Sequence, residues 1–80
     1  MKKSIYSPQM QCLLNWLRDN RERQGLSMRD LAKCLDRPHS FVQKIENGER
    51  RLDIVEYLWY CEALQVSAHE GIDLLLDITP

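Results

Sequence analysis

Cysteine and histidine side chains are the first candidates for chemistry, because they supply nucleophiles and metal ligands. The three cysteines are Cys12, Cys34 and Cys61, and no two of them have the spacing of a Cys-x-x-Cys pair. The two histidines, His39 and His69, lie far apart and pair with no ligand-spaced cysteine. This pattern favours neither a disulfide framework nor a zinc site, so we expect a reduced, cytoplasmic protein without metal or cofactor. We also expect no enzyme, since no Ser/His/Asp, Cys/His or paired-carboxylate set has a catalytic spacing.

Charged side chains are the second candidates, because they are distributed unevenly along the chain. Residues 1–51 carry all 11 Lys and Arg residues and 6 of the 12 acidic residues, a net charge of +5. Residues 52–80 carry the other 6 acidic residues and no Lys or Arg, a net charge of −6. The total of −1 would by itself argue against nucleic acid. The division instead suggests an anionic partner for the basic segment, although an uneven, merely solvated surface would give the same counts.

The elements that must position these side chains are predicted to be short helices in one domain. The 80-residue chain is 44% hydrophobic and 29% charged, which suits a small globular domain, and no apolar stretch is long enough to span a membrane. Ser7 before Pro8, and Ser27, are suited to begin helices, whereas Gly25 and Gly48 are suited to end them. We expect a flexible arm at 1–6, helices at 7–25, 27–36 and 38–48, and two more helices within 53–76.

Apolar residues at three- and four-residue spacing predict which helix faces are buried. In the third helix these residues are Val42 and Ile45. In the last two helices the expected buried residues are Leu58, Cys61, Leu64, Ile72 and Leu75, with Leu76 beside them.

The second and third predicted helices are joined by a tight turn, as in a helix-turn-helix. Ala32 is small where the second helix must approach the third, and Asp36 tolerates the positive φ that such a turn often needs. Val42 and Ile45 would pack the third helix onto the first two. Other small helical bundles have Ala and Leu at similar spacing, so this pattern alone leaves the fold open.

Longer stretches resemble the Cro/phage-repressor (Xre) family of prokaryotes and phages. The matching residues are Leu17-Arg18-x-x-Arg21-x-x-x-Gly25-Leu26-Ser27-x-x-Asp30-Leu31-Ala32-x-x-Leu35, Ser40-Phe41-Val42-x-Lys44-Ile45-Glu46-Asn47-Gly48-Glu49-Arg50-Arg51 and Ala63-Leu64-x-Val66-Ser67. The resemblance implies an all-α, lambda-repressor-like domain of five helices that binds double-stranded DNA, usually as a homodimer on a palindromic operator. Two residues depart from the family pattern: Asp36 replaces the usual turn glycine, and Pro38 stands where Ser or Thr commonly caps the third helix.

The resemblance places base recognition on the third helix, whose N-terminal residues enter the major groove in this architecture. By position it assigns this role to His39, Ser40 and Lys44, with Gln43 beside them. Lys44 can donate to guanine O6 and N7, and Gln43 can pair with adenine. The alternatives are that Ser40 bonds only to its own backbone and that Lys44 reaches only a phosphate or solvent.

Two further segments are expected to contact the DNA backbone. Arg50 and Arg51, in the loop after the third helix, would lie over phosphates and fix the register of the protein on DNA. The N-terminus of the second helix would abut another phosphate, because its free N–H groups favour an anion. The residues at that end are Ser27, Met28 and Arg29. A solvated basic loop is the alternative for Arg50 and Arg51.

Two further expectations concern a structural ion pair and a dimer surface. Arg21 and Glu46 occupy positions that form a largely buried ion pair in the family, so Arg21 is not counted as a DNA contact. The helices after residue 52 have no Lys or Arg and cannot face phosphates, so we expect them to form the dimer interface. The candidates are Trp59, Leu74, Leu76 and Ile78, although Trp59 could instead cover the core of its own domain.

The leading hypothesis from the sequence is a sequence-specific, nucleoid-associated transcriptional regulator, most simply a homodimeric repressor. A phage-type repressor, the controller of a restriction-modification operon and an antitoxin all fit equally well. The alternative is a protein-interaction module that binds a toxin or another regulator and has weak or no DNA binding. The acidic second half favours this alternative, whereas Lys44, Arg50 and Arg51 oppose it.

Overall fold

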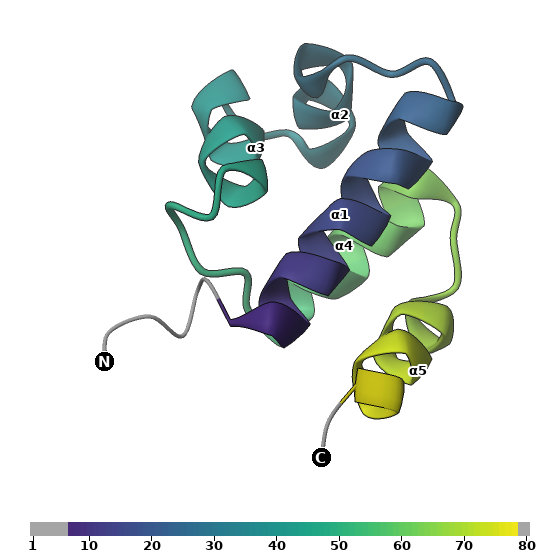
Figure 1. The fold of residues 1–80 in the computed structure, drawn as a ribbon. Coiled ribbons are helices and arrows are strands. Elements are labelled where there is room, and N and C mark those ends of the chain that lie inside the picture. Colours follow the sequence, from purple (N-terminus) through teal and green to yellow (C-terminus); the bar gives the residue numbers. More distant parts are fainter. Residues whose placement is uncertain (1–6, 79–80) are drawn as a thin grey trace.

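The computed structural model describes residues 7–78, and the arm expected at 1–6 lies outside them. The described residues form five helices joined by short turns, without a strand (Figure 1). The helices are α1 (Pro8–Arg23), α2 (Met28–Leu35), α3 (His39–Glu46), α4 (Ile54–Leu64) and α5 (Ala68–Ile78). The all-α, five-helix fold class expected from the sequence is confirmed.

The helix starts follow from local capping. The Ser7 hydroxyl accepts a hydrogen bond from the Met10 amide at 3.1 Å, and Pro8 occupies the first helical position of α1. Ser27 with Asp30, and Asp53 with Glu56, form reciprocal capping boxes at the starts of α2 and α4. The bounds of the helices differ from the expected ranges by one or two residues, since those ranges included capping and turn residues. Helix α5 continues to Ile78, two residues beyond the expected end at 76.

Helix α1 is the centre of the fold, and α3, α4 and α5 all contact it. In Figure 1, α1 runs diagonally in front of α4, α2 and α3 lie together at one end, and α5 lies at the opposite side. The core is built from apolar side chains of the first four helices. Its buried members are Leu13, Leu14, Leu17, Leu31, Ala32, Val42, Ile45, Tyr57, Tyr60, Cys61 and Leu64.

The expected inner face of α4 was partly wrong. Leu58 is 49% exposed, whereas Tyr57 and Tyr60 are buried together with Cys61 and Leu64. Residues 57, 60, 61 and 64 repeat at the three- and four-residue spacing of one helix face, and a leucine at 58 falls outside that face. Tyr57 and Tyr60 bury their aromatic rings although each carries a polar hydroxyl group. The apolar pattern left both tyrosines out, so it assigned the wrong inner face to α4.

The expected inner face of α5 was also partly wrong. Ile72 and Leu76 are 36% and 65% exposed, and Leu75 is only partly buried against the core. The residue that α5 buries is Gly71. A Cβ atom at Gly71 would overlap the Tyr57 hydroxyl and lie 2.8 Å from the Trp16 ring. Helix α5 therefore packs by close approach of its backbone to aromatic side chains, which an apolar-residue pattern does not reveal.

Candidate nucleic-acid interface

Helix α3 has one fully buried face and one polar face. Val42 and Ile45 are buried completely on the inner face. The structure brings together the four residues proposed to read bases on the other face, since positions 39, 40, 43 and 44 follow one another at helical spacing. Ser40, Gln43 and Lys44 are exposed, and His39 is half-buried. Hydrogen-bond donors and acceptors therefore line the accessible side of α3, which is a prerequisite for reading base edges in a groove.

The turn between α2 and α3 holds this helix in place. Asp36 has φ 56° and ψ 46°, in the left-handed region, as the sequence predicts. This conformation lets the Arg37 amide donate to the Ala32 carbonyl at 2.9 Å, which closes the end of α2. Ala32 is only 2% exposed, so the two helices come close at this small residue.

The expected ion pair between Arg21 and Glu46 is present. The Arg21 guanidinium donates from Nε and Nη2 to the two Glu46 carboxylate oxygens, at 2.6 Å and 3.0 Å. It also donates from Nη1 to the Leu26 carbonyl at 2.8 Å. The hydrogen bond to Glu46 raises the pKa of Arg21, so the arginine stays charged. Both side chains are more than nine-tenths buried, and the pair joins α1 to the C-terminal end of α3.

The N-terminus of α2 is less open to an anion than the sequence suggests. The Asp30 carboxylate accepts a hydrogen bond from the Ser27 amide at 3.0 Å, and this contact lowers the pKa of Asp30. A negative charge of the protein itself therefore already lies at this helix end. The amides of Met28 and Arg29 precede the first intrahelical hydrogen bonds, and the Arg29 side chain is exposed.

The two arginines after α3 differ in their surroundings. Arg50 donates from Nη1 and Nη2 to the two carboxylate oxygens of Glu56, both at 2.9 Å, and from Nη1 to the Arg51 carbonyl at 2.8 Å. Its guanidinium also lies 4.7 Å from the centre of the Phe41 ring. Arg51 is exposed. Arg50 is thus paired with Glu56 while its side chain stays 40% exposed, and its contact with a phosphate stays a prediction.

Glu56 has a structural role beyond the capping of α4. Besides Arg50 it accepts a hydrogen bond from the Asp53 amide at 3.1 Å. The hydrogen bond from Arg50 lowers the pKa of Glu56, and Glu56 is only 8% exposed. Arg50 and Glu56 are six residues apart and separated by a non-helical loop. No helical spacing rule therefore predicts that they form an ion pair.

Comparison with known proteins agrees with this geometry. A helix-turn-helix domain family model matches residues 15–71. A solved structure described as an XRE-family like protein from Pseudomonas syringae pv. tomato str. DC3000 has a TM-score of 0.86 and 37% sequence identity, covering 98% of this chain and 95% of that chain. A mutant of the restriction-modification controller protein C.Esp1396I has a TM-score of 0.77 and 22% identity, covering 89% and 90% of the two chains, and is similar in fold. No curated protein matches the chain.

The chain belongs to the XRE family of helix-turn-helix proteins. It is a DNA-binding transcription regulator by family, and α2 and α3 are its helix-turn-helix. No helix within residues 7–78 is long and apolar enough to cross a membrane. Over the same residues, no group of three or more His, Cys, Asp or Glu side chains could hold a metal ion.

This XRE-family protein exposes an apolar face on α4 that sequence reasoning found only in part. We call this surface the α4 face; its members are Ile54, Val55, Leu58 and Trp59, each between 41% and 62% exposed. The other proposed dimer residues lie on α5, where Leu76 and Ile78 are exposed. Leu74 is half-buried and lines a hollow against α1 with Trp16, so it is a weaker candidate.

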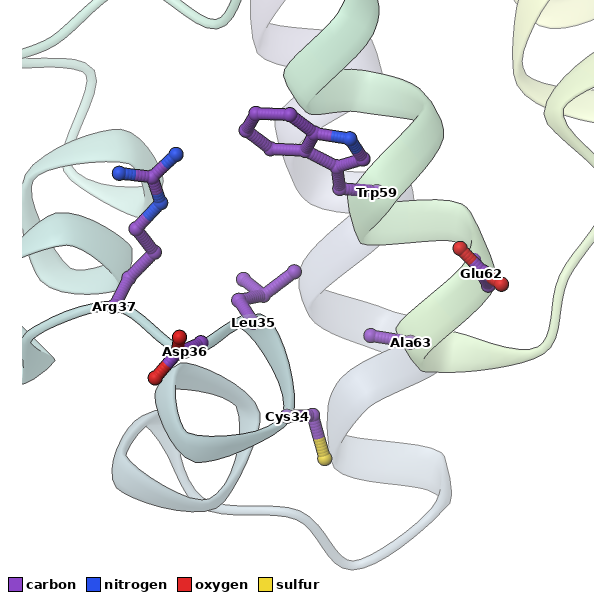
Figure 2. Close-up of a pocket in the computed structure, with 7 residues that line it drawn as sticks. All are labelled: Cys34, Leu35, Asp36, Arg37, Trp59, Glu62 and Ala63. Carbon is purple, nitrogen blue, oxygen red and sulfur yellow. The ribbon is translucent and has the colours of Figure 1, made fainter.

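A groove of about 500 Å³ separates the C-terminal end of α2 from α4. Figure 2 shows Leu35 and Ala63 projecting into it from the two helices, with the Arg37 guanidinium and the Trp59 indole at its upper end. Cys34, Asp36 and Glu62 complete the lining. The groove thus lies between the helix-turn-helix and the α4 face.

Proposed function

We propose that this XRE-family protein is a sequence-specific repressor that binds a palindromic operator as a homodimer. The observation that carries the proposal is the polar stripe of α3, formed by His39, Ser40, Gln43 and Lys44 opposite a fully buried face. A rigid helix with donors and acceptors on its only accessible side suits insertion into the major groove. Lys44 would contact guanine O6 and N7, and Gln43 would pair with adenine.

The phosphate contacts in this proposal differ from those expected from the sequence. Arg51 and Arg29 are exposed on the loop after α3 and at the start of α2, so both can reach the DNA backbone. The Met28 amide and Ser27 lie at the same end of α2, although Asp30 weakens the attraction there. Arg50 ranks below these contacts, because it is paired with Glu56.

The α4 face supports the homodimer. Four large apolar side chains on one exposed helix face mark an interaction surface rather than scattered surface residues. Leu76 and Ile78 at the end of α5 would extend the interface. The acidic segment 52–80 would then lie away from the phosphates, while α2 and α3 face them.

Selection of binding sites from random double-stranded DNA tests the reading of bases. The wild-type protein should enrich a two-fold symmetric sequence, and failure to enrich any sequence at low salt would overturn the proposal. Lys44→Ala should lower specific affinity by about 1–3 kcal/mol and relax the preference at one base position. Lys33→Ala, an exposed lysine of α2, is the charge-matched control and should leave base preferences unchanged.

A protein partner is a second candidate function, favoured by the same α4 face. A toxin or another regulator with an apolar, basic surface could cover this face in place of a second copy. Sedimentation of the purified chain distinguishes the two: a dimer supports self-association, whereas a monomer up to high micromolar concentration supports a separate partner.

A further inference from the structure

An arginine that the sequence analysis did not single out connects the helix-turn-helix to α4. Arg37 lies between α2 and α3, and its guanidinium carbon is 5.5 Å from the centre of the Phe41 ring on α3. The same carbon is 5.2 Å from the Trp59 ring on α4. Figure 2 shows the Arg37 side chain running upward from its backbone, with its guanidinium beside the indole. Arg37 therefore bridges two helices through cation–π contacts.

The Phe41 ring has a second connection to α4. The Arg50 guanidinium lies 4.7 Å from the centre of this ring and is paired with Glu56 of α4. We call the set Trp59, Arg37, Phe41, Arg50 and Glu56 the arginine–aromatic cluster. Both arginines that contact Phe41 are thus held by a residue of α4 as well.

The position of Phe41 makes this cluster important for DNA reading. Helix α3 is eight residues long, and the Arg21–Glu46 pair holds its C-terminal end. Its N-terminal end has no side-chain capping hydrogen bond, because Pro38 occupies the N-cap. Base contacts in this architecture come from the N-terminal part of the helix. The contacts made by Phe41 therefore secure the half of α3 that must be placed most accurately.

We propose that Arg37 and Arg50 are positioning residues that fix the N-terminal half of α3 against α4 by holding Phe41, and that they thereby set the sequence selectivity of the protein. The claim that the two arginines set sequence selectivity rests on the proposed function. The claim that they fix the position of α3 applies to the free protein and can be tested without DNA. Since Trp59 and Glu56 belong to α4, the cluster also fixes α3 relative to the helix that carries the proposed dimer surface.

The first test measures helix position without DNA. Residual dipolar couplings of backbone N–H bonds report the angle between α3 and α4 in solution. Arg37→Gln and Phe41→Leu should each change the couplings of residues 39–42, while those of α1 and α4 remain mutually consistent. Arg37→Lys keeps a cation near both rings and should restore most of the wild-type couplings. Wild-type couplings in both Arg37→Gln and Phe41→Leu would overturn the proposal.

The second test measures selectivity as the ratio of affinities for a selected duplex and for the same duplex with its site scrambled. A cation–π contact at a partly exposed site is worth a factor of roughly two to five, and Arg37 makes two such contacts. Arg37→Gln should therefore lower the ratio about tenfold, and Arg37→Lys should recover most of it. Arg18→Gln removes an exposed arginine of α1 and controls for the lost charge. The ratio of affinities for this variant should equal that of the wild-type protein.

The outcomes separate the two proposals. If the Arg37→Gln ratio is unchanged while affinity for both duplexes falls equally, Arg37 is a phosphate contact and its role in selectivity is refuted. If the wild-type protein distinguishes no duplex at all, the proposed function fails, and the dipolar couplings still decide whether the cluster positions α3.

Discussion

At the residue scale, the Arg21–Glu46 pair joins segments 25 residues apart in sequence with both charges removed from solvent. Removing charges from water is costly, and that cost is offset only while both partners are present. A further hydrogen bond from Arg21 to the Leu26 carbonyl fixes the loop before α2. The pair thus orients the two ends of the helix-turn-helix with respect to α1.

We predict that Glu46→Gln lowers the free energy of unfolding by about 3–5 kcal/mol, because it removes the close counterion of the buried Arg21 charge. The exposed Glu22 carboxylate, 3.7 Å from Arg21 Nη2, then remains as its weaker partner. Urea denaturation at neutral pH measures the change. The double variant Arg21→Met/Glu46→Leu should recover most of the loss, less the contribution of the hydrogen bond to Leu26. A loss below about 1 kcal/mol for Glu46→Gln would show that the pair is no more than a surface contact.

Glu56 gives a prediction on pH. The hydrogen bond from Arg50 lowers its pKa in the folded state, so its contribution to stability is present above the unfolded-state pKa of about 4.3. The contribution is lost as pH falls through the lower folded-state value. The stability difference between wild type and Glu56→Gln should therefore be largest at pH 7 and should nearly vanish at pH 2. Glu62→Gln, at an exposed position of α4, is the control, and urea denaturation at both pH values is the measurement.

The sequence predicted the roles of residues that interact with their near neighbours in the chain. It did not predict contacts between residues that a loop brings together. The positive φ of Asp36 and the capping box of Asp53 with Glu56 follow from neighbouring residues, and both were predictable. The Arg50–Glu56 pair and the Arg37 contacts depend on the conformations of the turns before and after α3. From the sequence alone, Arg37 and Arg50 therefore could not be distinguished from arginines without a partner in the domain. Arg21–Glu46 was foreseen only through the family resemblance, since no spacing rule connects positions 21 and 46.

At the element scale, α5 differs from the other helices in how it is attached. It buries a glycine where the others bury large apolar side chains. The Tyr57 hydroxyl donates to the Ala68 carbonyl at 2.6 Å at the start of α5, and the Trp16 ring lies against Gly71. The helix is thus attached to α4 by a hydrogen bond and to α1 by contact with an aromatic ring.

We predict that Gly71→Ala destabilises the protein by about 1–3 kcal/mol, although alanine has the higher helix propensity. The new methyl group would overlap the Tyr57 hydroxyl and the Trp16 ring, so α5 must move away from both. Urea denaturation gives the stability, and tryptophan emission in a Trp59→Phe background, where Trp16 is the remaining tryptophan, reports the displacement. Asp73→Ala at an exposed site of α5 is the matched control; a Gly71→Ala variant at least as stable as wild type would show that α5 adjusts without cost.

At the scale of the whole molecule, folding changes the meaning of the charge division. The basic segment loses two of its cations to internal pairs, Arg21 with Glu46 and Arg50 with Glu56. Arg29, Lys44 and Arg51 remain exposed on α2, α3 and the loop that follows. The count of Lys and Arg in the basic segment therefore overstates how many cations are unpaired within the domain. The placement of the exposed ones on the helix-turn-helix is consistent with the proposed contact.

The same charge division predicts opposite salt dependences for DNA binding and dimerisation. Two copies joined through the α4 face would bring together two segments that each carry −6 and no Lys or Arg, and this repulsion is screened by salt. DNA binding releases counterions, so its affinity falls as salt rises. Sedimentation between 50 and 500 mM NaCl should show a dimer that becomes tighter by several-fold, while gel shifts over the same range show weaker DNA binding. Leu58→Ser, which removes an exposed side chain from the α4 face, should remain monomeric at every salt concentration. A dimer that dissociates as salt rises would instead require contacts between the basic segment of one copy and the acidic segment of the other. That result would contradict an interface made of two α4 faces packed against each other.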